Sequence, residues 1–249
     1  MALGMFCAIP LPLHIWDAKL TATMVASLPL VGLVVGALWW LAALLLTAIT
    51  FPIVMVAAIL TVTPFFIAGF IHLDGYMDTS DALLSRRPLE DKLRILKDPN
   101  VGAFAVVMLV ILFLLQFAAV YTVVEGGRYL ALLISVCVVS RCCSALAIFV
   151  LRHLPISNYG ATLSQNIGTR HRLFVLLLGG AAIALSYLYA GATGVVVCAA
   201  VVLGFALAMR GVHREFEGVS GDLLGYSLVV GELCGLIALA MLQGLEIHI

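Results

Sequence analysis

Three carboxylates on one short stretch carry the clearest chemical signal in the sequence. Asp74, Asp78 and Asp81 stand at positions i, i+4 and i+7. At about 100° per residue, they fall within roughly 60° of one another on a helix face. Acids that face the same way repel one another, whereas a divalent cation would hold them together. The spacing therefore predicts the metal-binding edge of an active site.

A basic segment follows these acids and ends in a fourth carboxylate. Asp98 comes directly after Lys97, at the end of a predicted short amphipathic helix, and would complete a cluster of four. Hard oxygen ligands of this kind suit Mg²⁺, or Mn²⁺, better than Zn²⁺. Arg86, Arg94 and Lys97 lie beside the acids in the sequence and can take phosphate oxygens. The set favours a substrate with a diphosphate group, and the plainer alternative is a solvated acidic loop.

Two further acids lie near the end of the chain. Asp222 follows Ser220 at the start of an apolar run, where it is either a helix N-cap or a ligand, and both interpretations stay open. Ten residues further, Glu232 would lie about 15 Å into a membrane at 1.5 Å per residue. Arg141 lies at the same predicted depth in another apolar run. Charges buried in lipid need partners, so we expect an ion pair between Arg141 and Glu232.

The composition determines the kind of fold that must position these residues. The chain is 64% hydrophobic and 10% charged, with a mean hydropathy of +1.20. Soluble domains carry about 25% charged residues, and outer-membrane barrels need alternating apolar and polar residues. We therefore expect an all-α polytopic membrane protein with one integral membrane domain over residues 1–249. A formal net charge of zero gives no electrostatic reason to expect nucleic-acid binding.

Seven transmembrane helices are expected from the apolar runs. Their approximate ranges are 28–48, 53–71, 103–121, 129–151, 173–189, 194–209 and 223–241. This arrangement gathers the polar segments 72–102, 152–172 and 210–222 on the same side as the N-terminus. That side then holds 11 of the 13 basic residues, and only Arg128 and Arg141 lie elsewhere. Because basic residues favour the cytoplasmic side, we expect a cytoplasmic N-terminus and catalytic loops on the cytoplasmic face of the inner membrane.

These motifs also carry a family resemblance. The run from His72 to Asp81, with Asp74-Gly75 and Asp78 inside it, resembles the aspartate motif of the cobalamin synthase family, the adenosylcobinamide-GDP ribazoletransferases. Further stretches are similar to that family in order and spacing: residues 29–36, residues 95–102 with Lys97-Asp98, and Ser220-Gly221-Asp222-x-x-Gly225 with Glu232. The resemblance covers essentially the whole chain. It departs from the family pattern at Ala82 and Ala105, where glycine is common, and at residues 156–162.

The resemblance implies a reaction, a cofactor and a set of site residues. A hydroxyl of α-ribazole, or of its 5′-phosphate, would attack the cobinamide-linked phosphorus of adenosylcobinamide-GDP, and GMP would leave. Mg²⁺ would be held on the diphosphate by the four carboxylates, one of which would also serve as general base. The catalytic and metal-binding set is then Asp74, Asp78, Asp81 and Asp98, and the substrate-binding set is His72, Arg86, Arg94, Lys97 and Asp222. Membrane lipid and a second copy of the chain are further expected partners.

Two other classes of membrane protein also use clustered acids. The CDP-alcohol phosphotransferases follow their Asp-Gly pair with Ala-Arg, whereas this chain has Asp78-Thr79 at that place. A transporter or cation channel is expected to have mid-membrane acids in several spans, and we find only Glu232 at such a depth. Release of GMP from adenosylcobinamide-GDP distinguishes the first interpretation from both alternatives.

Overall fold

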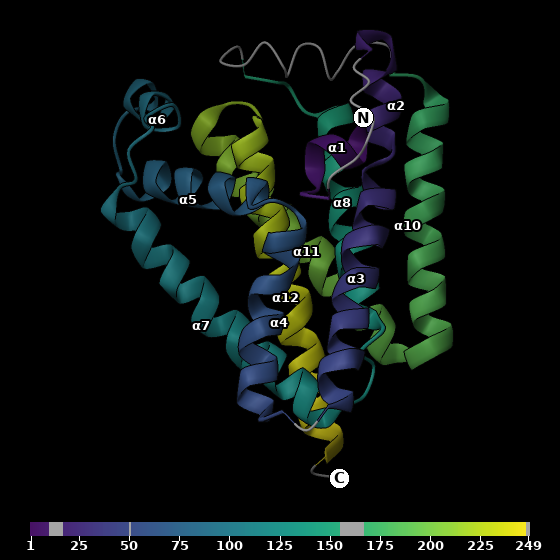
Figure 1. Ribbon diagram of the computed structural model, residues 1–249. Helices are drawn as coiled ribbons and strands as arrows, with labels where there is room; N and C mark the ends of the chain where they lie inside the picture. Colours follow the sequence, from purple (N-terminus) through teal and green to yellow (C-terminus); the bar gives the residue numbers. More distant parts are fainter. Residues whose placement is uncertain (10–16, 50, 155–166, 248–249) are drawn as a thin grey trace.

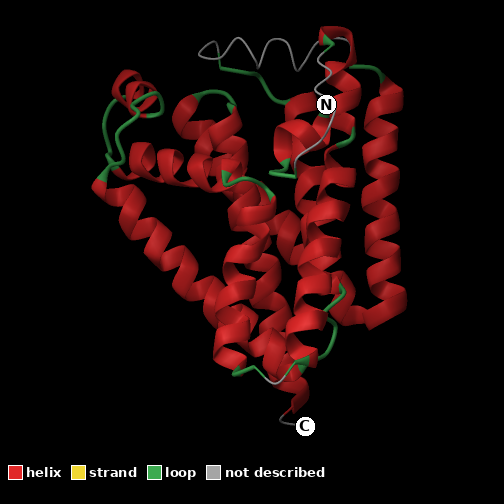
Figure 2. Ribbon diagram, in the orientation of Figure 1, coloured by secondary structure: helices red, strands yellow, loops and turns green. Residues whose placement is uncertain are grey.

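The computed structural model describes residues 1–9, 17–49, 51–154 and 167–247 of the chain. Within these residues the protein is built of helices, and no β-strand is found (Figure 2). The helices are α1 (Ala2–Phe6), α2 (Thr21–Ala26), α3 (Leu28–Ala48), α4 (Ile53–Ile67), α5 (Ile71–Leu84), α6 (Leu89–Ile95), α7 (Ala103–Gly126), α8 (Leu132–Val150), α10 (Thr169–Ala190), α11 (Ala192–Phe216) and α12 (Gly221–Ile247), with a short 3₁₀-helix at Ala18–Leu20. The predicted all-α fold is confirmed.

Six helical stretches in this part of the chain are long and apolar enough to cross a membrane. They are α2 with α3, α7, α8, α10, α11, and α12 as far as Leu245. The outer surface agrees with a lipid environment: on α10, Leu177 and Leu188 are 71% and 78% exposed. Side chains of this kind, exposed in such number, are unfavourable in water. The prediction of a multi-pass membrane protein is therefore confirmed, while the side on which the N-terminus lies stays a prediction.

The predicted second span, 53–71, differs from the structure because its helix is broken. Helix α4 ends at Ile67, and α5 begins at Ile71 at 94° to it. Gly69 and Phe70 between them adopt left-handed backbone conformations, with φ of 67° and 62°. Glycine adopts this conformation readily, and the two residues together turn the chain by about a right angle. As a result, α5 carries its acids along the end of the bundle instead of continuing the direction of α4 (Figure 1).

The described parts of the three predicted polar segments lie at one end of the bundle. Helices α5 and α6, the turn between α11 and α12 and the end of α8 gather at the end opposite the C-terminus (Figure 1). The second and third segments are also joined by backbone hydrogen bonds. The amide of Leu154 donates to Val219 O at 2.9 Å, and the amide of Val219 donates to Arg152 O at 2.9 Å. Most of segment 152–172, including residues 156–162, lies outside the described residues.

Helix α12 lies at the centre of the bundle and packs against α5, α7, α8 and α11. Small residues allow close approach between the helices, as is usual where lipid removes the hydrophobic driving force for association. At the crossing of α3 and α8, a Cβ atom on Gly36 would come within 2.6 Å of Ile134 Cα. Residues 29–36, which resemble a family segment, therefore include a packing position that holds α8 in place.

Candidate active site

The acids of α5 lie on one side of their helix, as the spacing predicts, and α12 adds another acid to them. The first turn of α12 crosses α5 so closely that a Cβ atom on Gly75 would lie 2.8 Å from Asp222 Cα. Burial raises the pKa of Asp78 from 3.8 to about 6, and the charges of Asp74, Asp222 and Asp81 add to the effect, in that order. We call Asp74, Asp78, Asp81 and Asp222 the acidic cluster.

Asp98 was predicted as the fourth acid, but the structure brings Asp222 to the other three instead. The Asp98 carboxylate is exposed and accepts hydrogen bonds from Asn100, at 2.9 Å from the amide and 2.7 Å from Nδ2, which lower its pKa. Its segment does approach the cluster, because a Cβ atom on Gly102 would overlap the carboxylate of Asp81. The segment that carries Asp98 therefore contacts Asp81 through Gly102, whereas the Asp98 side chain is hydrogen-bonded to Asn100. Its role in metal binding stays a prediction.

Asp222 is not the N-cap of α12. The hydroxyl of Ser220 accepts the hydrogen bond from the amide of Leu223 at 3.3 Å, which is the capping interaction. Ser220 is thus the N-cap, which rules out one of the two interpretations of Asp222 that the sequence left open. The Asp222 carboxylate accepts hydrogen bonds from its own backbone amide and from the Ser220 hydroxyl, and it lies within the acidic cluster.

The predicted phosphate-binding bases lie on the segment that joins α5 to α7. Arg86, Arg94 and Lys97 are exposed, and the one ion pair found among them within the described residues is between Arg94 and Asp91 at 3.4 Å. A base that the sequence did not single out, Lys92, is buried and bonds Glu215 of α11. This contact fixes α6 against α11, while the place of the exposed bases in substrate binding stays a prediction.

The predicted ion pair within the bundle is confirmed. Arg141 Nη1 lies 2.6 Å from Glu232 Oε1, and both side chains are buried. Ser140 donates a second hydrogen bond to the same carboxylate oxygen at 2.8 Å. The pair joins α8 to α12, the helix that carries Asp222.

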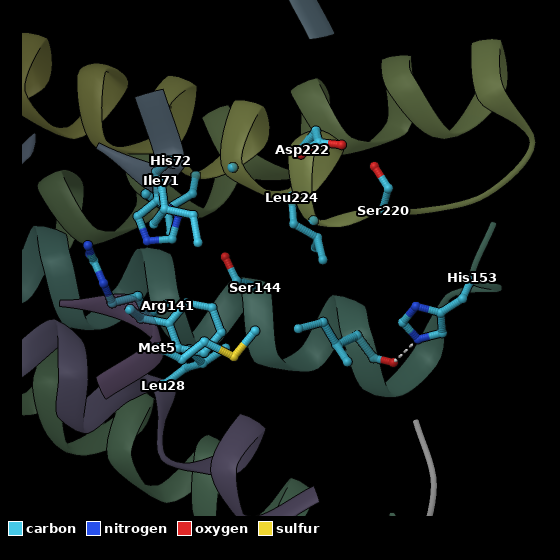
Figure 3. A pocket seen from close by; sticks show the side chains of 15 residues that line it. Met5, Leu28, Ile71, His72, Arg141, Ser144, His153, Ser220, Asp222 and Leu224 are labelled. Atoms are coloured by element: carbon cyan, nitrogen blue, oxygen red, sulfur yellow. Dashed lines mark hydrogen bonds between the residues drawn. The ribbon is translucent and has the colours of Figure 1, made fainter. Parts of the chain in front are cut away.

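A cavity of about 290 Å³ is lined by Arg141 of the ion pair and Asp222 of the acidic cluster (Figure 3). His72 lines it and stacks on Phe6, with ring centroids 6.4 Å apart. Burial, and to a smaller extent the charge of Arg141, lowers the pKa of His72 to about 3, so its ring is neutral. His153 also lines the cavity and bonds Ile148 O at 3.0 Å. Sequence spacing gives no signal for this cavity, because five segments of the chain contribute to its wall.

The residues fit a hard divalent cation by their chemistry. Four carboxylates converge on one edge of the bundle, and their mutual repulsion is part of what raises the pKa of Asp78. Throughout the described ranges, no three His, Cys, Asp or Glu side chains already stand in a metal-holding arrangement. The donor set is thus appropriate for Mg²⁺, and the coordination itself stays a prediction.

Fold and site together define a class: a multi-pass helical membrane protein with an acidic cluster and flanking bases at one end. A family model described as cobalamin-5-phosphate synthase matches residues 1–240. The chain belongs to this family, as the motif resemblance predicted.

Curated relatives cover almost the whole chain. A protein of Clostridium botulinum (strain Alaska E43 / Type E3) is 36% identical over 236 residues, 95% of this chain and 94% of its own length. A protein of Clostridium perfringens (strain ATCC 13124) is 35% identical over 243 residues, 97% of this chain and 96% of its own. A protein of Stutzerimonas stutzeri is 36% identical over 222 residues, 87% of this chain and 86% of its own. Each is named adenosylcobinamide-GDP ribazoletransferase. No solved structure matches the chain.

Proposed function

We propose that this protein is an adenosylcobinamide-GDP ribazoletransferase, which acts at the last step of cobalamin synthesis. The relatives' names and the family match support this activity. The structural observation that carries it is the convergence of Asp74, Asp78 and Asp81 on α5 with Asp222 on α12. An acidic cluster beside exposed arginines suits a diphosphate substrate held through a divalent cation.

The reaction is a substitution at phosphorus. A hydroxyl oxygen of α-ribazole, or of its 5′-phosphate, forms a bond to the cobinamide-linked phosphorus. The bond from that phosphorus to the oxygen of the GMP leaving group breaks, and the hydroxyl proton passes to a carboxylate. Mg²⁺, when bound, would neutralise the diphosphate and stabilise charge on the leaving group.

The residues of this chain supply the remaining functions. Asp78 would accept the proton, because it lies among Asp74, Asp222 and Asp81 at the proposed site of reaction. Asp74 and Asp81 would hold the cation with it. Arg86 and Arg94 are exposed on the segment that follows α5 and would take phosphate oxygens as bidentate donors.

The activity is tested by GMP release from adenosylcobinamide-GDP and α-ribazole, with purified protein in detergent. We expect release in the presence of Mg²⁺ and none in EDTA, with activity restored by added Mg²⁺. Asp74→Ala and Asp78→Ala should each lower the rate by at least 100-fold, roughly the loss expected when one electrostatic stabiliser is removed. Glu90→Gln, at an exposed acid of α6, is the matched control and should keep full activity. Full activity of both alanine variants would contradict the metal assignment.

A further inference from the structure

The cavity beside the acidic cluster has the size and lining of a small-molecule site. Its volume of about 290 Å³ is near the lower end of the range for such sites. Most of its wall is apolar, formed by Met5, Phe6, Leu28, Ile148, Leu224 and Leu228. A corrin macrocycle is far too large for this space, whereas a nucleoside with a flat apolar base matches it.

Polar groups lie at the two ends of this cavity. Arg141 and His72 are at one end, and Ser220 and His153 are at the other (Figure 3). Asp222 lines the cavity and also belongs to the acidic cluster. A ligand that fills the cavity would therefore lie next to Asp222, where the reaction is proposed to occur.

Arg141 has donor capacity that the protein leaves unused. Its side chain is 2% exposed, and every hydrogen bond that its guanidinium donates to a described residue comes from Nη1. Nε is buried without a partner in this part of the chain. Glu232 already neutralises the charge, so the guanidinium does not need a second anion. The unused donors suit a neutral acceptor atom, such as a ring nitrogen.

We propose that this cavity binds the acceptor nucleoside, with its apolar base between α1, α8 and α12. The free ring nitrogen of a benzimidazole-type base would accept a hydrogen bond from Arg141. The ribose would lie at the opposite end, near Ser220 and Asp222. This inference rests on the proposed function and assigns a binding site to one of its two substrates. The corrinoid diphosphate would then bind on the exposed side of the acidic cluster.

Variants that fill the cavity test the assignment. Ser144→Phe on α8 and Leu224→Phe on α12 place a ring in the space from opposite walls. We expect each to raise the KM for α-ribazole at least tenfold, while the KM for adenosylcobinamide-GDP changes less than twofold. Ala181→Phe is the matched control, because it fills a separate cavity between α3, α8 and α10. A rise in the KM for adenosylcobinamide-GDP alone, or no change in either KM, would overturn the inference.

Direct binding to the unmodified protein keeps the test decisive if the phenylalanine variants fail to fold. Fluorescence titration without Mg²⁺ or corrinoid should give the highest affinity for α-ribazole, a lower one for the benzimidazole ribonucleoside and the lowest for the imidazole ribonucleoside. Each nucleoside in this series has less apolar surface than the one before it. The indole ribonucleoside, which lacks the ring-nitrogen acceptor, should bind at least tenfold more weakly than the benzimidazole one. Equal affinity for these two nucleosides would refute the role of Arg141. Nucleoside binding in this order without GMP release would instead refute the proposed function and leave the cavity assignment standing.

Discussion

At the scale of single residues, the protein buries charged side chains at two sites. Asp78 is only partly exposed and shares its surroundings with three other carboxylates. Arg141 and Glu232 are buried as a pair, with Ser140 completing the hydrogen bonds to the carboxylate. The clustered carboxylates destabilise the folded protein when no cation is bound. The ion pair destabilises it only if one of its partners is removed. The two sites therefore respond differently to mutation.

The raised pKa of Asp78 makes the stability of the metal-free protein depend on pH. The folded value is about 6, whereas an unfolded aspartate titrates near 3.9. Between these values the folded protein binds more protons, so stability falls as the pH rises and levels off above about pH 6. In EDTA at pH 7, Asp78→Asn should thus be more stable than the unmodified protein, by about 1–2 kcal/mol after solvent screening.

Thermal unfolding in detergent from pH 4.5 to 8 measures this difference, with Glu90→Gln as the control. Millimolar Mg²⁺ should reverse the order at pH 7, because the cation offsets the repulsion only when all the acids are charged. If the unfolding temperatures of Asp78→Asn and the unmodified protein changed identically with pH, the Asp78 carboxylate would not destabilise the folded state.

Removing one partner of the buried ion pair should be strongly destabilising. Glu232→Gln leaves the Arg141 guanidinium without its counter-charge, and Arg141→Gln does the converse. We expect each change to cost about 3–5 kcal/mol, and the double variant to cost less than the sum of the two. Thermal unfolding of the three variants measures the coupling, with Glu125→Gln on the exposed end of α7 as the control. Strictly additive losses would mean that the pair contributes nothing as a pair.

At the scale of helices, the site depends on two local features of α5. The left-handed residues Gly69 and Phe70 turn α5 by 94° from α4, and Gly75 lets α12 approach it closely. Without the turn, the acids would continue in the direction of α4. Without the close approach, Asp222 would not reach the other acids.

Adding one methyl group at the α5–α12 crossing should separate the acids. In Gly75→Ala the new Cβ atom would lie 2.8 Å from Asp222 Cα, a backbone atom that can yield only if α12 shifts. We expect at least a tenfold loss of GMP release, because misplacement by about 1 Å can cost 100-fold in rate. Gly180→Ala on α10 is the control: no atom lies within 4 Å of its new methyl group, and alanine favours the helix. Unchanged activity of Gly75→Ala would show that the crossing does not set the geometry of the site.

The structure also separates what the sequence can predict from what it cannot. Helical phase placed Asp74, Asp78 and Asp81 together, and residue counting from the span ends paired Arg141 with Glu232 correctly. The approach of Asp222 to the three acids of α5 depends on which helices touch, and nothing local to Asp222 encodes that. The break between α4 and α5 was missed because the residues around Gly69 remain apolar, so hydropathy alone extends the span.

At the scale of the whole molecule, the polar segments share one end, and the charge asymmetry predicts that this end faces the cytoplasm. A reporter that is active only in the cytoplasm, fused to the N-terminus, should therefore be active. The same reporter fused after the last helix should be inactive. Activity of the C-terminal fusion and inactivity of the N-terminal one would invert the predicted orientation and place the acidic cluster outside.

The ion pair between Arg141 and Glu232 has a consequence for biogenesis. Its two residues are 91 positions apart, and the carboxylate lies on α12, which is made after α8. At about 5–20 residues per second, roughly 5 to 20 s pass between synthesis of the arginine and of its partner. During that interval α8 holds an uncompensated charge, so its stable integration waits for α12. In ribosome-bound chains that stop before Glu232, Cys137 of α8 should therefore react with a water-soluble thiol reagent, whereas complete chains should protect it.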